Sequence, residues 1–380
     1  MQTAAAAVMA WPERLLSWRD RLYASPAFHH WASALPFTRA LAQRRARALF
    51  DIVAGFVYSQ VLLAAVRLRL FEILAEGPQS LEQLAPRLKL PAEGCARLLD
   101  AAVSLRLLQR RRGGLYGLGP LGGPMVGNTA LLAMVEHHAV LYGDLHDPVA
   151  LLRGEAGAAA LAGMFPYANV DSPGSLDPAR VASYSALMSA SQPMVADQIL
   201  DAYPLQQHRC LLDVGGGEGT FLSRVAQRAP DLKLMLFDLP AVADRARAQF
   251  VARGLSERAG AFGGDFLADE LPRGADVISL VRVVHDHDDA RVLRIMKAAR
   301  RALPDDGTLL LAEQMADTAG AEPMGDAYFG FYLLAMGRGR PRSPAQIRAL
   351  LEQAGFGDVR LQRTRLPLQA RLIVARCRLS

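Results

Sequence analysis

The sequence is poor in cysteine. Only Cys95, Cys210 and Cys377 occur among its 380 residues. Cysteines that are few, odd in number and far apart supply neither a disulfide framework nor a Cys-x-x-Cys metal site. They fit a reducing compartment, so we expect a cytoplasmic protein.

The sequence also lacks a long apolar run and a strong excess of charge. Its longest apolar stretch, residues 55–66, is shorter than the roughly 20 residues that cross a bilayer. No cationic start precedes the alanines at 4–7, which disfavours a signal peptide. The net charge of +6 is modest. Its arginine patches are interpreted as solvated surfaces, with contact to an anionic surface as the alternative. With 51% apolar residues, we expect a large globular core and two or three domains.

A glycine-rich turn is the most informative feature that is present. The apolar run 211–214 ends in Gly215, Gly217 and Gly219, and helical spacing follows. Glycine lets a ligand approach the backbone closely, and the helix start behind it offers unpaired N–H groups. A second apolar run ends about 20 residues later in Asp238, where a carboxylate can hold two ribose hydroxyls. The pattern predicts a nucleotide site.

The glycine spacing separates two nucleotide chemistries. A dinucleotide fingerprint requires glycine where Thr220 or Leu222 stands. The spacing Gly215-x-Gly217-x-Gly219, preceded by Asp213, resembles the first motif of S-adenosylmethionine-dependent methyltransferases. A glycine-rich loop without a ligand is the alternative.

The chain divides into four predicted regions. Residues 1–45 form an arm rich in tryptophan and arginine, which suits either a membrane interface or a partner subunit. Residues 46–125 read as three helical segments and a hairpin, a winged-helix pattern. Residues 126–205 are mostly helical and link it to residues 206–380, where strands and helices alternate. Such alternation predicts an α/β fold with a mostly parallel sheet and helices on both faces.

Several local expectations follow within these regions. We expect a helix from 48 to 74 with a break near Gly55, a capping box from Ser80 to Gln83, and a hairpin around Gly113. A Pro/Gly break is expected at 171–174. Strands are expected near 210–214, 233–238, 259–262, 276–282 and 307–313. A closing hairpin is expected at 359–361 and 370–375.

The winged-helix pattern also permits a DNA-binding regulator with a nucleotide-sensing domain, in which residues 92–108 would be the recognition helix. That segment is heavily apolar and has no Asn or Gln to read base edges. We therefore expect no nucleic-acid partner.

A second constellation, residues 282–289, follows the strand expected near 276–282. The carboxyl ends of parallel strands share one edge, so His285 should lie beside the glycine turn. A neutral imidazole there can act as a general base. Glu313, which ends the next strand, is a candidate to fix its tautomer; a surface rim acid is the alternative.

Two other interpretations of this constellation remain open. His285, His287 and Asp289 offer metal ligands, as in the His-x-His-x-Asp-His motif of binuclear hydrolases, but Ala290 replaces the last histidine. Asp288 and Asp289 can also simply cap the following helix. The base is favoured, and no metal is expected.

These motifs together resemble the small-molecule O-methyltransferase family typified by caffeate and hydroxyindole methyltransferases, over about residues 46–377. The likeness is carried by Leu-Asp-Val-Gly-Gly-Gly-Glu-Gly, Phe-Asp-Leu-Pro at 237–240, Gly-Gly-Asp-Phe at 263–266 and the His285-Asp286 pair. It implies a Rossmann-like class I methyltransferase, with S-adenosyl-L-methionine as cofactor and a winged-helix unit that forms a homodimer.

The resemblance also implies a role for individual residues. Gly215, Gly217 and Asp213 would hold the cofactor, with Asp238 at its ribose. The other implied contacts are Asp265 and Phe266 at the adenine, Arg282 near the cofactor, His285 as base and Glu313 as its orienting partner. The family's His-Asp-Trp reads His-Asp-His here, and Pro341 stands near where a second carboxylate is usual; Asp326 is a candidate substitute.

Within the family, residues 47–60 and 324–339 resemble enzymes of purple bacteria that methylate the tertiary hydroxyl of acyclic carotenoids. The acceptor would then be an apolar hydroxylated small molecule; a phenolic or polyketide acceptor is the alternative. Adaptable apolar side chains suit a long tunnel, although each also suits ordinary core packing. The candidates are Met164, Phe165, Met188, Met194, Phe329, Phe331 and Met336.

Overall fold

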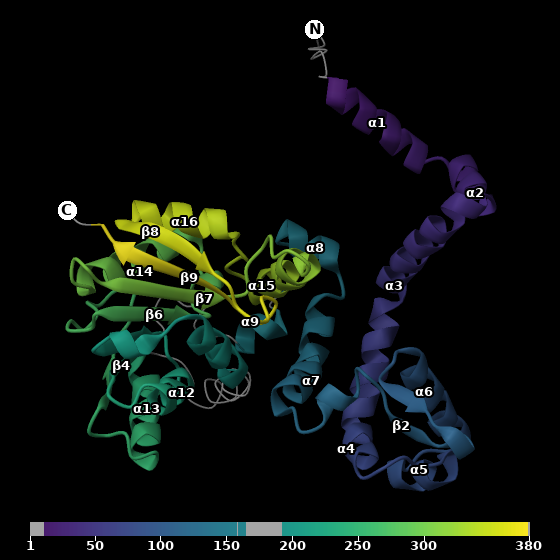
Figure 1. The fold of residues 1–380 in the computed structure, drawn as a ribbon, viewed down its shortest axis with the longest axis horizontal. Coiled ribbons are helices and arrows are strands. Elements are labelled where there is room, and N and C mark those ends of the chain that lie inside the picture. The colour runs from purple at the N-terminus through teal and green to yellow at the C-terminus, as the bar shows by residue number, and fades with distance from the viewer. Residues whose placement is uncertain (1–10, 158, 165–191, 379–380) are drawn as a thin grey trace. The chain divides into compact units, whose positions relative to one another are not determined.

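The computed structural model describes residues 11–157, 159–164 and 192–378. The chain forms two compact units that meet in sequence at Gly127 and Asn128. Figure 1 shows the helical first unit and, in the second, the sheet.

Helices dominate the first unit. They are α1 (Trp11–Tyr23), α2 (Pro26–Ala34), α3 (Pro36–Arg67), α4 (Leu70–Ala75), α5 (Leu81–Leu88) and α6 (Ala92–Ser104). The hairpin of β1 (Leu108–Arg110) and β2 (Tyr116–Leu118) follows, and Gly113 and Gly114 adopt positive φ in its turn. The expected capping box is confirmed, because Ser80 and Gln83 each bond the other's backbone N–H.

The long helix α3 differs from expectation. It passes through Gly55 without a break and ends at Arg67, where Leu68 and a left-handed Arg69 turn the chain into α4. Surrounding helical residues hold Gly55 in place, so a single glycine does not end the helix. By length and composition α3 is apolar enough to cross a membrane, contrary to the inference from residues 55–66 alone. Core helices and signal sequences pass the same test.

The second unit is built on a seven-stranded sheet. It begins with α7 (Thr129–Asp144), α8 (Pro148–Arg153) and α9 (Ala160–Met164). The strands lie in the order β5 (Ala259–Gly263), β4 (Lys233–Asp238), β3 (Cys210–Val214), β6 (Val277–Val281), β7 (Thr308–Glu313), β9 (Arg371–Cys377) and β8 (Phe356–Gln362). The first five are parallel, and β9 runs antiparallel to both of its neighbours.

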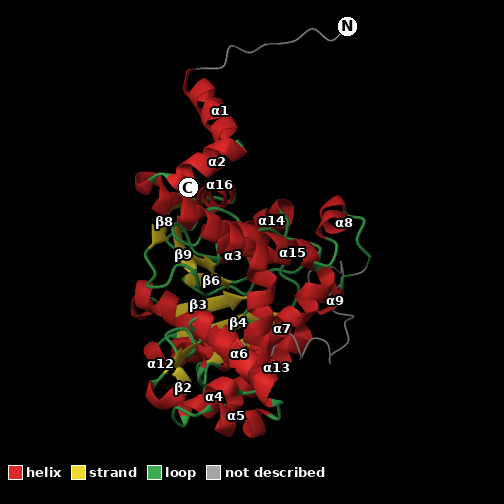
Figure 2. Ribbon diagram, turned by 90° about the vertical axis from the view of Figure 1, so that its right-hand side faces the viewer, coloured by secondary structure: helices red, strands yellow, loops and turns green. Residues whose placement is uncertain are grey.

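Helices cover both faces of this sheet (Figure 2). One core contains side chains of α14 (Asp289–Ala302) and α16 (Pro344–Gln353); the other contains those of α12 (Thr220–Arg228) and α13 (Pro240–Ala252). Neighbouring residues alternate between the cores: Leu212 lies in the first and Leu211 in the second. This alternation is the period of two that a strand imposes.

The expected α/β alternation is confirmed, with all five parallel strands within two residues of their predicted bounds. The closing hairpin is present, but β9 lies between β7 and β8. The break expected at 171–174 lies outside the described residues. Two short elements complete the unit near the site: the single turn η5 (Val284–Asp286) and the π-helix η6 (Pro323–Phe329), which leads into α15 (Gly330–Met336).

Candidate active site

The glycine turn follows β3 at the carboxyl edge of the sheet. Gly215, Gly217 and Gly219 all adopt positive φ, a conformation that side-chain-bearing residues rarely take. A Cβ on Gly219 would lie 2.6 Å from the ring of Phe250, whereas one on Gly217 would meet nothing within 4 Å. The turn therefore packs against Phe250 at Gly219 and has open space at Gly217.

Asp238 joins this turn to the neighbouring strand. Its carboxylate accepts the Gly217 N–H at 2.8 Å and the Leu239 N–H at 2.7 Å. Burial raises the pKa of Asp238 to about 6, against the opposing effect of these two donors. The group is still mostly ionised at neutral pH, so it remains a strong acceptor beside the open glycine.

Asp213 lies beneath the turn. It is 1% exposed, and its Oδ1 accepts the Ser279 hydroxyl at 2.6 Å. A Cβ on Gly216 would lie 2.6 Å from its Oδ2, so the turn passes directly over this carboxyl. Burial raises the pKa of Asp213 to about 7. Its surroundings favour support of the turn over direct contact with a ligand.

Asp265 and Phe266 follow β5, two strands from the glycine turn. Asp265 accepts the Leu267 N–H at 2.8 Å, which fixes the bend after the strand. The Phe266 ring lies near the turn, 3.7 Å from where a Cβ on Gly215 would stand. It also meets the ring of His287 edge to face, with centroids 5.6 Å apart. These two residues thus lie at the predicted edge.

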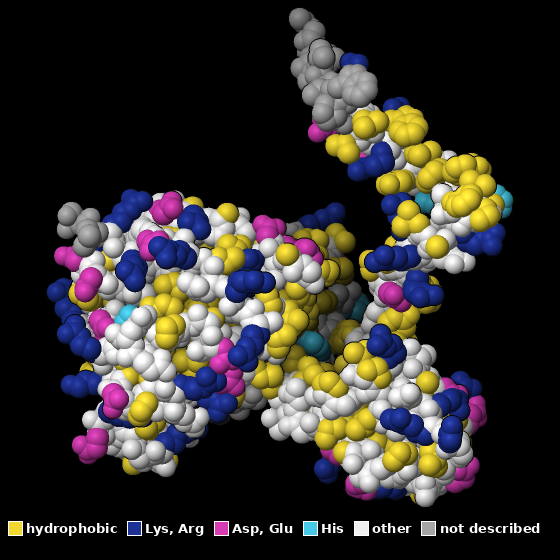
Figure 3. Space-filling model, viewed as in Figure 1, with side chains coloured by type: hydrophobic (Ala, Val, Ile, Leu, Met, Phe, Trp, Pro, Cys, Tyr) yellow, Lys and Arg dark blue, Asp and Glu magenta, His cyan; other side chains and the backbone are white. Residues whose placement is uncertain are grey.

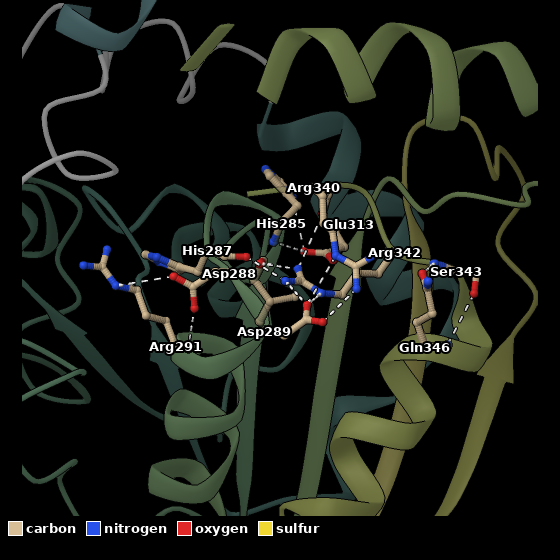
Figure 4. A network of polar contacts seen from close by, with 11 residues as sticks. His285, His287, Asp288, Asp289, Arg291, Glu313, Arg340, Arg342, Ser343 and Gln346 are labelled. Atoms are coloured by element: carbon tan, nitrogen blue, oxygen red, sulfur yellow. Dashed lines mark hydrogen bonds and ion pairs between the residues drawn. The ribbon is translucent and has the colours of Figure 1, made fainter. Parts of the chain in front are cut away.

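His285 lies in η5, after β6, and is buried beside Glu313 (Figure 4). Its Nδ1 lies 3.2 Å from Glu313 Oε2, and its Nε2 lies 3.2 Å from Asp286 Oδ1. Its backbone N–H donates to the same Glu313 oxygen at 3.1 Å. Glu313 is fully buried, so the structure brings the predicted base and its expected partner together.

The charges around His285 strengthen it as a base. Burial lowers the pKa of His285, but the carboxylates of Asp286 and Glu313 outweigh burial and the nearby Arg282, so the pKa lies above its usual value. Burial also raises the pKa of Asp286. Arg282 is in a left-handed conformation, and its N–H donates to Ala312 O at 2.8 Å. The ring is therefore suited to accept a proton.

In the alternative metal cluster, His287 and Asp289 do not converge with His285. Asp288 caps α14 by accepting the Arg291 N–H at 2.9 Å, as the capping interpretation expects. Asp289 pairs with Arg340 instead. Burial lowers the pKa of His287 to about 4, which keeps its ring neutral against Phe266. Within the described ranges, no three His, Cys, Asp or Glu residues are grouped to hold a metal ion.

Sequence reasoning missed two residues at this site. Asp286 was quoted only as part of the His-Asp motif and was given no role. Its contact with Nε2 of His285 depends on the shape of η5. Arg342 is fully buried beside the turn, although charged residues are rarely buried and nothing in the sequence marks it. Asp326, the candidate substitute for the carboxylate missing at Pro341, is exposed and accepts the Asp317 N–H. It therefore does not flank His285.

An aromatic wall lies on the other side of His285. Phe329 is 6.4 Å from the His285 ring, and Tyr328 and Tyr332 pack against Phe329. His138 and His137 of α7 bond the two tyrosine hydroxyls at 2.7 and 2.8 Å. Burial lowers the pKa of both histidines and raises that of both tyrosines, so the wall carries no charge near neutral pH.

The methionines and phenylalanines expected along a tunnel have different environments. Met336 is 1% exposed and packs in a small core with α7 and α8, which is ordinary core packing. Met194 contacts Gln369. Phe165 and Met188 lie outside the described residues.

The open glycine turn and its adjacent carboxylate lie at the carboxyl edge of a doubly wound sheet. A buried histidine with a raised pKa lies at the same edge. Ligands of such sheets bind at this edge. The fold and the glycine turn are those of a nucleotide-binding α/β protein, with a buried histidine at the same edge of the sheet.

Comparison with known proteins gives the particular family. The O-methyltransferase domain model matches residues 142–357, and the O-methyltransferase dimerisation domain model matches residues 50–127. A demethylspheroidene O-methyltransferase of Cereibacter sphaeroides is 44% identical over 90% of this chain and 89% of that protein. The chain belongs to the O-methyltransferase family and is an S-adenosylmethionine-dependent O-methyltransferase.

Other relatives agree with this assignment. An acetylserotonin O-methyltransferase of Mus musculus is 33% identical over 86% of this chain and 88% of that protein. The structure of human N-acetylserotonin methyltransferase in complex with SAM has a TM-score of 0.70 at 26% identity, over 88% of this chain and 98% of that one. The dimerisation domain match at 50–127 covers the winged-helix pattern for which DNA binding was the alternative. It supports a homodimer.

Proposed function

We propose that this enzyme transfers the methyl group of S-adenosylmethionine to the tertiary hydroxyl of an acyclic carotenoid, with His285 as general base. The His285 ring, held between Glu313 and Asp286 at the edge that carries the glycine turn, is the observation on which the base rests. The acceptor class rests on similarity to demethylspheroidene O-methyltransferases of Cereibacter sphaeroides and Rhodobacter capsulatus, at 44% and 43% identity.

The residues of the turn fit the cofactor. Open space at Gly217 leaves room for a ligand against the backbone, and Asp238 beside it offers two oxygens to ribose hydroxyls. Asp265 and Phe266 would flank the adenine, with Arg282 near the cofactor. Asp213 would act from below by shaping the turn. When bound, the cofactor supplies an electrophilic methyl group on a positively charged sulfur.

Proton removal is the task of His285. An aliphatic alcohol is too weak an acid to ionise beforehand, so its proton must leave as the oxygen attacks. In the tautomer that a base requires, Nδ1–H donates to Glu313, which leaves Nε2, 3.2 Å from Asp286 Oδ1, to accept the proton. The imidazolium that forms lies between two carboxylates, which stabilise its charge. His285 is only 8% exposed and Glu313 is fully buried, which limits the access of water to the ring.

The aromatic wall is compatible with an apolar acceptor. Its histidines and tyrosines satisfy each other's hydrogen bonds, so they present rings instead of unpaired polar atoms. Phe329 carries this surface up to His285.

The arm before the dimerisation match would give the dimer a peripheral membrane contact. Trp18, Trp31 and Phe37 are 57%, 54% and 97% exposed, and all three precede residue 50. Figure 3 shows hydrophobic side chains along α1 and α2 beside basic ones. Residues 13–47 contain seven arginines and two carboxylates, a charge that complements an anionic lipid surface. The enzyme would act at the cytoplasmic face of a membrane that holds its apolar substrate.

The Asp238→Ala variant should bind S-adenosylmethionine at least about 10-fold more weakly, because charged hydrogen bonds to ribose contribute about 1.5–3 kcal/mol. Calorimetric titration measures this affinity. Asp244→Ala, which changes an exposed carboxylate of α13, is the matched control and should bind normally. Equal affinity in both variants would remove Asp238 from the ribose site.

The His285→Ala variant should bind the cofactor nearly normally but lose turnover by at least about 10²-fold. His146→Ala, at an exposed histidine, should retain activity. Turnover of the unmodified enzyme should fall with decreasing pH at a point above histidine's usual pKa, because protonation removes the base. In Glu313→Gln this acid limb should move to lower pH. Near-normal turnover of His285→Ala would exclude the base role.

Label from methyl-labelled S-adenosylmethionine should enter acyclic tertiary-hydroxyl carotenoids in a panel that also contains phenols and polyketides. Extraction and chromatography of the labelled product identify the acceptor. Label confined to phenols or polyketides would replace the carotenoid with that acceptor class.

The full chain should sediment with vesicles that contain anionic lipid, and added salt should weaken this binding because it screens the arginines. The Trp18→Ser/Trp31→Ser double variant should lose most of the binding and remain dimeric. Leu366→Ser, at a residue 45% exposed in the second unit, is the control. A double variant that binds vesicles normally, or that becomes monomeric, would contradict the membrane role.

A further inference from the structure

Arg342 makes an unusual set of contacts for a fully buried arginine. Its Nη1 donates to the Val284 carbonyl at 2.9 Å, its Nη2 to the His287 carbonyl at 2.7 Å, and its Nε to Asp289 at 2.8 Å. Figure 4 shows the guanidinium among the residues of the 284–289 turn. Its two backbone partners therefore lie on either side of His285.

The segment before Arg342 reinforces this contact. The Arg340 N–H donates to the His285 carbonyl at 3.0 Å. Gly339 has a φ of +87°, and a Cβ there would overlap the same carbonyl oxygen. Glycine is thus required for the close approach of the two segments. The carbonyls of Val284, His285 and His287 are all held by residues 340–342.

Arg342 is itself anchored to rigid parts of the fold. Its carbonyl accepts the Ala316 N–H at 3.1 Å, just beyond β7. The next residue, Ser343, is the N-cap of α16 and forms a capping box with Gln346. Since α16 packs in the core beside the sheet, the base of the arginine side chain cannot shift easily.

The turn that carries His285 has little stability of its own. η5 is a single 3₁₀ turn, and such short turns have poor hydrogen-bond geometry. A guanidinium presents five donors in a fixed planar fork, so it can define the positions of several oxygens at once. Arg342 uses this fork on two turn carbonyls and one carboxylate.

We propose that Arg342 is a positioning residue for the methyl-transfer base: its buried guanidinium fixes η5 so that the His285 ring stays between Glu313 and Asp286. This inference rests on the proposed base role of His285. It also gives a physical answer to the missing carboxylate at Pro341, because the segment orients the histidine through its backbone carbonyls instead of through an acidic side chain.

The Arg342→Lys variant tests the proposal, because lysine keeps the charge but cannot bind three oxygens in fixed directions. We expect kcat to fall between about 10- and 10²-fold, since small misplacements of a catalytic group have effects of this size. The affinity for S-adenosylmethionine should stay unchanged, and the acid limb of the kcat profile should move to lower pH as the ring loses its contact with Glu313.

Arg258→Lys is the matched control. Arg258 donates to the carbonyls of Ala226, Ala229 and Leu232, away from the active site. This variant should lower the melting temperature and leave both kcat and its pH profile unchanged. If Arg342→Lys behaves in the same way, Arg342 is only structural and the proposal is wrong.

Should Arg342→Lys fail to fold, Asp289→Asn replaces it. Asp289 is half-exposed, and its neutralisation loosens the guanidinium without opening the core. A lower kcat with normal cofactor affinity supports the proposal, and an unchanged kcat overturns it. An active His285→Ala would instead refute the base role, whereas an inactive one beside a normal Arg342→Lys would refute the positioning role alone.

Discussion

The carboxylate of Glu313 is the contact on which the arrangement of the candidate active site depends. It is fully buried at the end of β7, and one oxygen receives both the ring and the backbone N–H of His285. A buried charge is strongly unfavourable without such partners. The carboxylate therefore holds the neighbouring turn in one arrangement, and Asp286 together with Glu313 raises the pKa of the histidine.

The glycine turn is linked to the turn that carries His285 through packing at the centre of the sheet. β3 lies between β4 and β6, which is where the strand order changes direction. The glycine turn after β3 approaches Val283 so closely that a Cβ on Gly215 would lie 2.8 Å from it. Phe266 reaches across to His287. The glycine turn and the segment that carries His285 are thus held next to each other at the same edge of the sheet.

Two features distinguish this chain from the pattern its family resemblance implies. His287 stands where the resemblance implies a tryptophan, and burial lowers its pKa to about 4, so it is a neutral ring edge to face with Phe266. At Pro341 an acidic side chain is replaced by a segment that binds carbonyls, with Arg342 beneath the turn.

The sequence by itself determined the alternation of strands and helices, the glycine turn, and the placement of Asp238, His285 and Glu313 at one edge, because these follow from local periodicity and from the geometry of parallel strands. It did not determine the end of α3, the contact of Asp286 with Nε2, or the burial of Arg342. Only the tertiary structure decided these, because helix ends, ion pairs and buried charges depend on partners that are distant in the chain or fixed by a single local turn.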